Sequence, residues 1–466
     1  MADAGSRTDQ VEREVLGRIT PRPELLARVA DLREELVRVA EAAARERKSP
    51  LVRAIVAGSA ARGTFLVDRF DFDLFLLFPT TLDRAGLEAE GMAIGRAILT
   101  APETRYAQHP YLRGRYGDFS VEAVPGYAVA DGAHPMTAVD RTPFHQAWLS
   151  ERETPELVDQ VRLAKQFLRA HGIYGSEAKT GGFSGYLVEL LVLHFGGFRP
   201  LLAAARGWTI PVRVAHDPSA KPRVPDDVAL VVDDPVDPAR NVSTALTRRN
   251  LALFILAADR YLTAPEPSAF VPHPVPLVGR PDGLERTKRR ATHVAVLTFE
   301  RPKLVDDILY PQLQKAERAV ATEAERLGFA VVGTSSAAGE GELVVLLEVG
   351  HRALPAVQVR SGPPVGVARS DDYLAKWGPS RADVVQGPYL TEDGKLAVET
   401  IRAERQVESL LSEAWTRLPV GKDLRAGRPP SVRPLAEVSD SPALQEAMTL
   451  LFEKRLPWAV GPAAPP

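Results

Sequence analysis

The sequence predicts a multidomain α+β protein, and three observations lead to that fold class. The chain has 466 residues, which corresponds to roughly three domains. Long amphipathic segments, such as residues 24–47, indicate helices, whereas short apolar runs, such as residues 74–78, indicate buried strands. Residues 265–281 carry many prolines and indicate a linker, beyond which the order of strands and helices changes.

Composition narrows the class of protein. Hydrophobic residues make up 45% of the chain and charged residues 25%, which is typical of a globular protein. The absence of cysteine excludes disulfides, thiolate metal sites and thiol catalysis. No apolar run reaches the roughly 18 residues of a membrane span, so we expect a cytoplasmic protein without a membrane partner. The formal net charge of −2 confines any nucleic-acid surface to a local basic patch.

Residues 54–79 hold the motif on which the functional interpretation depends. A turn of small residues, 58–64, is followed by Asp71 and Asp73 and then by the apolar strand. Because side chains alternate along a strand, both carboxylates point to one face, about 7 Å apart along the backbone. Carboxylates beside a buried strand require a compensating cation, and such oxygen ligands suit Mg²⁺ together with substrate phosphates. The N–H groups of the turn and the hydroxyl of Ser59 are equipped to hold a triphosphate.

Each of these motifs is common by itself. Such a turn can simply end a helix, and two aspartates at the start of a strand can be solvated. Their order, from turn through D-x-D to apolar strand, is far more specific. It resembles the signature of the nucleotidyltransferase superfamily, which includes polymerase beta and the poly(A) polymerases.

A third carboxylate is expected if two metal ions are used in catalysis. Residues 119–124 form a predicted strand in which Glu122 is the one acid, and Asp118 lies at the edge of that strand. Glu122 is therefore the first candidate for the third ligand and Asp118 the second. On the residues alone, a solvent-facing glutamate on an edge strand is an equally compatible reading.

Later segments supply helices and a second α+β pattern. Residues 154–171 predict a helix with Thr154 as its N-cap, and the apolar run that begins at Leu187 predicts a buried helix. The order strand, helix, strand, strand over residues 293–349 resembles half of a ferredoxin-like or RNA-recognition-motif fold, without the base-stacking aromatics of the latter.

The chain resembles archaeal-type, class I CCA-adding enzymes, a family of tRNA nucleotidyltransferases. The resemblance covers most of the chain, is strongest over residues 50–315 and is weak beyond 335. The matching segments are GSAARGT, DFDLFLLFP, RYAQHPY, VEAVPGY, AVDRTPFHQAWL, VRLAKQFLRAHGIYG, GGFSGYLVELL, VVDDPVDPARNV and RPKLVDDILYPQL.

This resemblance implies a fold, a reaction and partners. The fold is a polymerase-beta-like head over residues 1–147, a helical neck and α/β body over 148–270, and a further body and ferredoxin-like or RRM-like tail over 271–466. The implied reaction adds C, C and A to the 3′ end of tRNA without a template, from CTP and ATP, with Mg²⁺ and release of pyrophosphate. The acceptor arm of tRNA is the implied partner, and a homodimer is compatible with the sequence.

The resemblance also assigns roles to residues. Asp71, Asp73 and Glu122 are the catalytic metal ligands, although the family usually has aspartate where this chain has Glu122. Arg240 is implied to read the edge of the incoming base. The full set of expected nucleotide-binding residues is Ser59, Arg62, His109, Thr142, His145, Lys165, Tyr174 and Arg240.

Two other functions stay open at this level. One is a poly(A)-type or small-molecule nucleotidyltransferase, against which the segments AVDRTPFH, GIYG and DPVDPARNV argue. The other is a non-catalytic RNA-binding descendant in which Glu122 marks lost catalysis. The presence of Asp71, Asp73, Lys165 and Tyr174 argues against that second reading.

Overall fold

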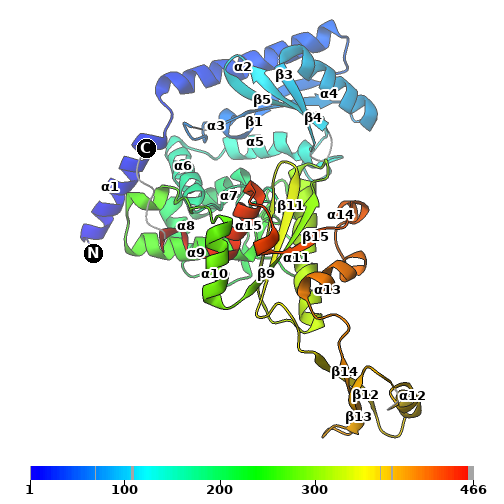
Figure 1. The fold of residues 1–466 in the computed structure, drawn as a ribbon. Helices are drawn as coiled ribbons and strands as arrows, with labels where there is room; N and C mark the ends of the chain where they lie inside the picture. Colours follow the sequence, from blue (N-terminus) through cyan, green and yellow to red (C-terminus); the bar gives the residue numbers. More distant parts are fainter. Residues whose placement is uncertain (1, 69, 107–109, 368, 379–380, 460–466) are drawn as a thin grey trace. The chain divides into compact units, whose positions relative to one another are not determined.

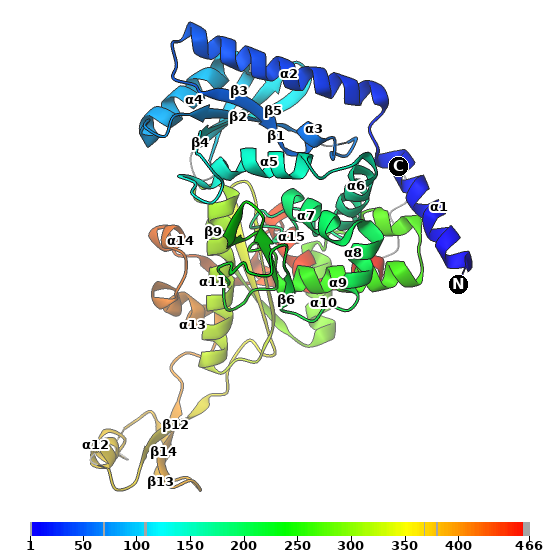
Figure 2. The same ribbon diagram turned by 180° about the vertical axis from the view of Figure 1, so that it is seen from behind.

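The chain forms two compact units, which are described separately here. The computed structural model describes residues 2–68, 70–106, 110–367, 369–378 and 381–459. The first unit consists of the chain up to residue 274 together with the chain from residue 456, and the second unit spans residues 275–455 (Figures 1 and 2).

The first unit begins with helix α1 (Ala2–Ile19) and contains a five-stranded sheet that helices cover on one face. Its strand order is β1-β2-β5-β4-β3, with β2 and β5 parallel and the other neighbours antiparallel. Helices α2 (Pro23–Glu46) and α4 (Arg84–Ile98) pack on one face (Figure 1). The strands are β1 (Arg53–Ala57), β2 (Phe72–Phe78), β3 (Thr100–Tyr106), β4 (Pro110–Tyr116) and β5 (Phe119–Tyr127).

Alternation along β2 decides what each face of this sheet carries. Leu74 and Leu76 are fully buried in the core beneath the two helices. Asp73 lies one position before Leu74 and therefore points to the opposite face, as does Asp71. Helix α5 (Thr142–Ser150) contacts β1. The functional motif therefore lies on the face that α2 and α4 leave open.

Two local structures in this sheet differ from the sequence prediction. Residues 58–62 form a short helix, α3 (Gly58–Arg62), instead of a simple turn, and Gly63 ends it with a φ of 70°. Strand β4 was not predicted, because its sequence PYLRGRY mixes glycine and arginine with its apolar residues. Pairing with β3 and β5 on both sides forms this strand despite its weak propensity.

Helices and a small sheet complete the first unit. The predicted N-cap is confirmed, because Thr154 Oγ1 accepts a hydrogen bond from the Leu157 N–H at 3.4 Å. Trp458, close to the C-terminus, packs edge-on against His171, so the chain returns to this unit. The helices are α6 (Pro155–Ala170), α7 (Gly185–Phe195), α8 (Phe198–Ala205) and α9 (Arg248–Thr263), and the strands are β6 (Val212–Val214), β7 (Leu230–Asp234) and β8 (Asp237–Asn241).

The second unit has the strand order of a ferredoxin-like fold. Its sheet runs β10-β11-β9-β15, entirely antiparallel, with β9 (His293–Glu300) and β11 (Glu342–Val349) in the centre. Helix α11 (Asp306–Leu327) shares one core with α13 (Val407–Ala414), as two crossover helices on one face do. The edge strands are β10 (Val331–Ala338) and β15 (Ser431–Pro434), and α10 (Arg280–Arg290) and α15 (Pro442–Phe452) cover the other face.

A three-stranded sheet is inserted into this fold. Its order is β12-β14-β13, and the predicted turn at Asp393 and Gly394 joins its last two strands, with Gly394 at a φ of 75°. The strands are β12 (Val357–Pro364), β13 (Val384–Leu390) and β14 (Lys395–Ile401). The predicted linker is only partly irregular, because a short 3₁₀ helix (Pro267–Phe270) and the start of α10 fall within it.

Within the described residues, no single helix has the length and apolarity that a membrane crossing requires. Helices α7 and α8 meet that criterion only when counted together across their 90° bend.

Candidate active site

The Asp73 carboxylate of the D-x-D motif lies against the backbone of Gly58. Gly58 begins α3 directly after β1, and Ala57, the last residue of β1, is the register partner of Asp73 on β2. Gly58 has a φ of 78°, and a Cβ built on it lies 2.1 Å from Asp73 Oδ2. Only glycine satisfies both the left-handed backbone and this contact. The glycine therefore makes room for the carboxylate.

Strand register places the acids in one row. In the parallel pair, Asp73 of β2 is the partner of Glu122 on β5. In the antiparallel pair, Glu122 is the partner of Arg113 on β4. Register partners point to the same face, so these side chains lie next to one another, with Asp71 two residues away from Asp73 on that face. The row brings together the three acids that the sequence singled out.

The alternative third acid lies elsewhere. Asp118 is 82% exposed and pairs with Arg28 at 3.1 Å, in the turn between β4 and β5. Glu122 is 23% exposed and has Asp73 as its neighbour. Of the two candidates, Glu122 is the one that the register aligns with the D-x-D motif.

Burial and mutual repulsion shift these carboxyl groups. Burial, the charge of Glu122 and the charge of Asp71 together raise the pKa of Asp73 to about 7. Burial also raises the pKa of Glu122, while Arg113 opposes that shift. In carboxyl groups with such shifts, burial and mutual repulsion outweigh the nearby arginines, and a hard divalent cation supplies further positive charge. A donor set of three neighbouring carboxyl groups fits such an ion.

The carboxylates do not yet converge as ligands. In the part of the chain that the structure describes, no group of three or more His, Asp or Glu side chains is arranged to hold a metal ion. Arg113 contacts two of the acids, since its guanidinium donates to Asp71 Oδ1 at 3.1 Å and lies 3.8 Å from Glu122 Oε1. The backbone therefore places the three acids next to one another, and an arginine contacts the side chains of Asp71 and Glu122.

A cavity of about 300 Å³ opens beside the D-x-D motif. Its lining includes Ser59 from α3 and Lys165 from α6, and it continues to Tyr174. Arg169, which pairs with Asp68 at 2.8 Å, adds a cation to the wall. Five of the expected residues therefore share one cavity: Ser59, Asp71, Asp73, Lys165 and Tyr174.

Lys165 and Arg62 are held by a buried glutamate. Glu189 of α7, 1% exposed, accepts hydrogen bonds at Oε1 from Lys165 Nζ and from Thr64 Oγ1, each at 2.7 Å. Its Oε2 accepts from Arg62 Nε at 2.9 Å. Although burial opposes it, the two cations lower the pKa of Glu189 to about 2. One carboxylate thus ties α3, α6 and α7 together.

A second acid adjoins this network. Glu153 Oε2 lies 3.6 Å from Arg62, and Glu153 Oε1 is buried and has no hydrogen-bond partner among the residues that the structure describes. Burial and the charge of Glu189 raise its pKa to about 7. A neutral carboxyl group at Glu153 is consistent with that unpaired oxygen.

Asp234 organises a separate cluster. It is fully buried, and its Oδ2 contacts His145 Nε2 at 2.8 Å and Arg240 at 2.7 Å. Tyr186 donates to its Oδ1 at 3.0 Å and stacks on the His145 ring with centroids 4.0 Å apart. Burial raises the pKa of Asp234, but the hydrogen bonds from His145, Val236 and Arg240 bring it down to about 2. Burial lowers the pKa of His145, which favours a neutral ring.

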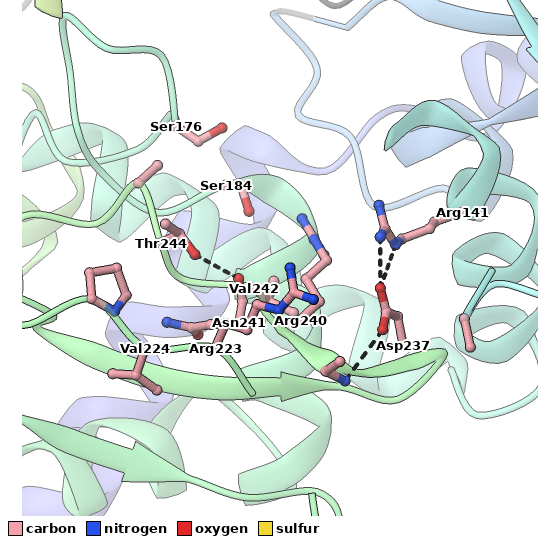
Figure 3. Close-up of a pocket in the computed structure, with 14 residues that line it drawn as sticks. Arg141, Ser176, Ser184, Arg223, Val224, Asp237, Arg240, Asn241, Val242 and Thr244 are labelled. Carbon is pink, nitrogen blue, oxygen red and sulfur yellow. Dashed lines mark hydrogen bonds and ion pairs between the residues drawn. The ribbon is translucent and has the colours of Figure 1, made fainter. Parts of the chain in front are cut away.

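Arg240 also lines the larger cavity, of about 760 Å³ (Figure 3). Arg141 and Arg223 line it as well, and Arg141 is paired with Asp237 at 2.7 Å. Figure 3 shows these arginines and the hydroxyls of Ser176, Ser184 and Thr244 around the opening. A cavity with cationic forks and hydroxyl groups is suited to an anionic or polar ligand such as a nucleotide.

The expected residues thus fall into two groups. The first group lies at the D-x-D motif and consists of the three acids together with Ser59, Lys165 and Tyr174. The second group is the Asp234 cluster, to which His145 and Arg240 belong. Thr142 begins α5, three residues before His145. Arg62 does not line the cavity beside the D-x-D motif but is buried against Glu189. His109 lies outside the described residues.

Sequence reasoning missed three residues that hold the site. Glu189 carried a detectable signal, because one acid within the otherwise apolar segment LVELLVL requires buried partners. Asp234 stands at the end of an apolar strand, as Asp73 stands near the start of one. Arg113 carried no such signal, since its role follows from strand register alone.

Comparison with known proteins gives consistent matches. Residues 159–271 match the family model of the tRNA nucleotidyltransferase second domain, and residues 290–427 that of the CCA-adding enzyme C-terminal domain. The CCA-adding enzyme of Methanosarcina barkeri is 36% identical over 89% of this chain and 91% of its own length. That of Halobacterium salinarum is 38% identical over 87% and 88%. Among solved structures, CdnC of E. coli MS115-1 with ATP matches 56% of this chain and 94% of its own, with 18% identity and a TM-score of 0.44. This similarity is too distant to bear on function.

Proposed function

The chain belongs to the family of CCA-adding enzymes, and on that premise we propose that it adds C, C and A to the 3′ end of tRNA, from CTP and ATP. It is a nucleotidyltransferase, so the reaction is attack of an RNA 3′-hydroxyl on an α-phosphate with pyrophosphate leaving. A cytoplasmic location and binding through the tRNA acceptor arm are part of this proposal.

One observation carries the proposal. The register of β2 and β5 aligns Asp73 with Glu122, beside a cavity that also contains Ser59, Lys165 and Tyr174. We propose that Asp71, Asp73 and Glu122 hold divalent cations, Mg²⁺ in the cell, which neutralise the triphosphate and lower the pKa of the attacking hydroxyl. The longer side chain of Glu122 serves where the family usually has aspartate.

The residues around the acids bind and orient the triphosphate. Ser59 and Tyr174 line the same cavity as Asp73, and their hydroxyl groups can donate to phosphate oxygens. Lys165 places a positive charge at that cavity, fixed there by Glu189 and Thr64. Positioning and charge neutralisation of this kind provide most of the catalysis in phosphoryl transfer.

Base selection is assigned to Arg240. Its guanidinium is fixed by Asp234, which also fixes His145, and it faces the larger cavity (Figure 3). A fixed fork can donate to a ring nitrogen or carbonyl of cytosine or adenine. We propose that the growing RNA end completes this pocket and changes its shape at each addition.

The test of base selection compares two arginines of one cavity. Arg240→Ala is expected to misincorporate on tRNA ending in each partial tail, whereas Arg223→Ala removes the same charge from the same wall and keeps the choice of base. Unchanged selection in Arg240→Ala overturns the assignment.

The test of the reaction uses defined RNAs. The wild-type protein is incubated with labelled CTP or ATP and tRNA lacking its 3′ tail, tRNA ending in CC, or an oligoadenylate. We expect C on the first substrate, A on the second and little label on the third. Labelling of oligoadenylate by ATP alone favours the poly(A)-type alternative, and absence of labelling on all three favours the non-catalytic one.

A further inference from the structure

Arg113 lies in the same row as the three carboxylates of the proposed metal site. Arg113 is the register partner of Glu122, so its side chain shares the face of the proposed metal ligands. Its guanidinium donates to Asp71 at 3.1 Å and lies 3.8 Å from Glu122 Oε1. Its Nε also donates to Ser120 Oγ at 3.3 Å, which fixes the side chain beside the acids. A protein cation therefore contacts two of the three proposed ligands.

The position of this arginine permits exchange. The Arg113 side chain is 43% exposed and the Asp71 side chain 34% exposed, so water reaches the contact. The guanidinium can swing into solvent at small cost, because a half-exposed ion pair contributes little stability. A divalent cation bound by Asp71 and Glu122 requires the same oxygens on the same face. The two cations therefore compete.

Resting on the proposed function, we propose that Arg113 is a resident counter-ion of the acidic site. It holds Asp71 and Glu122 in place while no divalent cation is bound, and it weakens the affinity of the site for a cation that arrives without a nucleotide. Arg113 is thus a positioning residue, and the metal that reaches the site with the triphosphate replaces it.

The test measures cation binding without catalysis. Mn²⁺ is the probe, and free Mn²⁺ is followed by electron paramagnetic resonance in the absence of nucleotide. Removing a half-exposed competing charge in Arg113→Gln is expected to lower the Kd by about two- to fivefold. Arg115→Gln is the control, because it removes the same charge from the same strand, and the Arg115 guanidinium donates to the backbone carbonyl of Asp118 at 3.0 Å. This control is expected to bind Mn²⁺ like the wild type.

Thermal unfolding gives a second measurement on the same proteins. In EDTA, Arg113→Gln is expected to melt below the wild type, because the carboxylates lose their counter-ion. Saturating Mn²⁺ is expected to raise its Tm by more than that of the wild type, since a ligand that binds the folded state more tightly stabilises it more.

Three results overturn the proposal. Unchanged or weaker Mn²⁺ binding by Arg113→Gln contradicts competition and leaves the proposed function intact. If Arg115→Gln binds Mn²⁺ as tightly as Arg113→Gln, the effect comes from the net charge instead of from the contact with Asp71 and Glu122. Absence of Mn²⁺ binding in all three proteins overturns the inference together with the metal site on which it rests.

Discussion

At the scale of single residues, Gly58 determines where the Asp73 carboxylate can lie. Its left-handed φ of 78° and the 2.1 Å approach of Asp73 Oδ2 to a built Cβ leave no room for another side chain. The position of the Asp73 carboxylate therefore depends on the backbone conformation between β1 and α3, and on the absence of a Cβ at Gly58.

Replacing glycines by alanine distinguishes the cost of a left-handed backbone from the effect of displacing Asp73. Gly58→Ala is expected to lose about 1–2 kcal/mol of stability through its φ and to lose activity as Asp73 is displaced. Gly117→Ala has a comparable φ of 57° and nothing within 4 Å of its Cβ, so it is expected to lose similar stability and keep its activity. Urea unfolding and nucleotide incorporation check the two effects, and full activity of Gly58→Ala contradicts the account.

Glu153 predicts how stability depends on pH. Its pKa is raised to about 7 in the folded protein, against an ordinary 4.5, so between these values the folded state holds a proton that the unfolded state releases. Stability therefore falls as pH rises from about 5 to about 7 and then levels off.

Glu153→Gln removes the contribution of Glu153 to this dependence, because glutamine does not titrate, and leaves the contribution of Asp73, whose pKa is also raised to about 7. The free energy of unfolding is measured with urea at intervals from pH 5 to pH 8. Relative to that of the wild type, the value for Glu153→Gln is expected to increase as pH rises. A constant difference across the range shows that Glu153 ionises normally.

The sequence predicts individual residues only where a motif marks them. D-x-D marks Asp71 and Asp73, and the strand around Glu122 marks the candidate third acid, and their role as metal ligands stays a prediction. Arg62 was expected at the triphosphate, and in the structure its guanidinium is hydrogen-bonded to Glu189, 127 residues further along the chain. No local pattern encodes a contact across such a separation.

At the scale of elements, Glu189 joins three helices. Its carboxylate receives Arg62 from α3 and Lys165 from α6, while Glu189 itself lies on α7. Removing one member of such a group leaves buried charges without partners, which is costly in a medium of low polarity.

The variant Glu189→Gln is therefore expected to lose about 3–5 kcal/mol of stability, measured by urea unfolding. Adding Lys165→Met to it is expected to cost less than the two single changes combined, because the charges are removed together. Glu88→Gln breaks the exposed pair with Arg84 at 3.1 Å and is expected to cost at most about 1 kcal/mol. Equal losses in Glu189→Gln and Glu88→Gln contradict a structural role for the buried network.

Most elements follow from periodicity and capping, and the exceptions have physical causes. Helix α2 and strand β2 carry strong 3.6-residue and buried-strand patterns, and both lie close to their predicted positions. Strand β4 was missed because its arginines and glycine weaken the strand pattern, while its two neighbours provide the hydrogen bonds. That strand contributes Arg113, so the missed element also hid a residue of the site.

At the scale of the whole molecule, the α+β fold class is confirmed, while the division at residues 147 and 270 stays a prediction. The ferredoxin-like half was predicted from residues 293–349, but completing its sheet requires β15 to pair with β9, matching Ser431 with Thr298. The inserted strands β12 to β14 separate these partners along the chain. Periodicity reports single elements and does not report such distant pairing.

The central claim is that Asp71, Asp73 and Glu122 form a divalent-cation site where the tRNA 3′ end meets a nucleoside triphosphate. The most direct measurement is Mg²⁺-dependent incorporation of labelled CTP into tRNA lacking its tail, by the wild type, Asp73→Ala, Glu122→Asp and Glu122→Ala. The account predicts a loss of at least about 100-fold in Asp73→Ala and Glu122→Ala, with Glu122→Asp active. Equal labelling by Asp73→Ala and the wild type would contradict it.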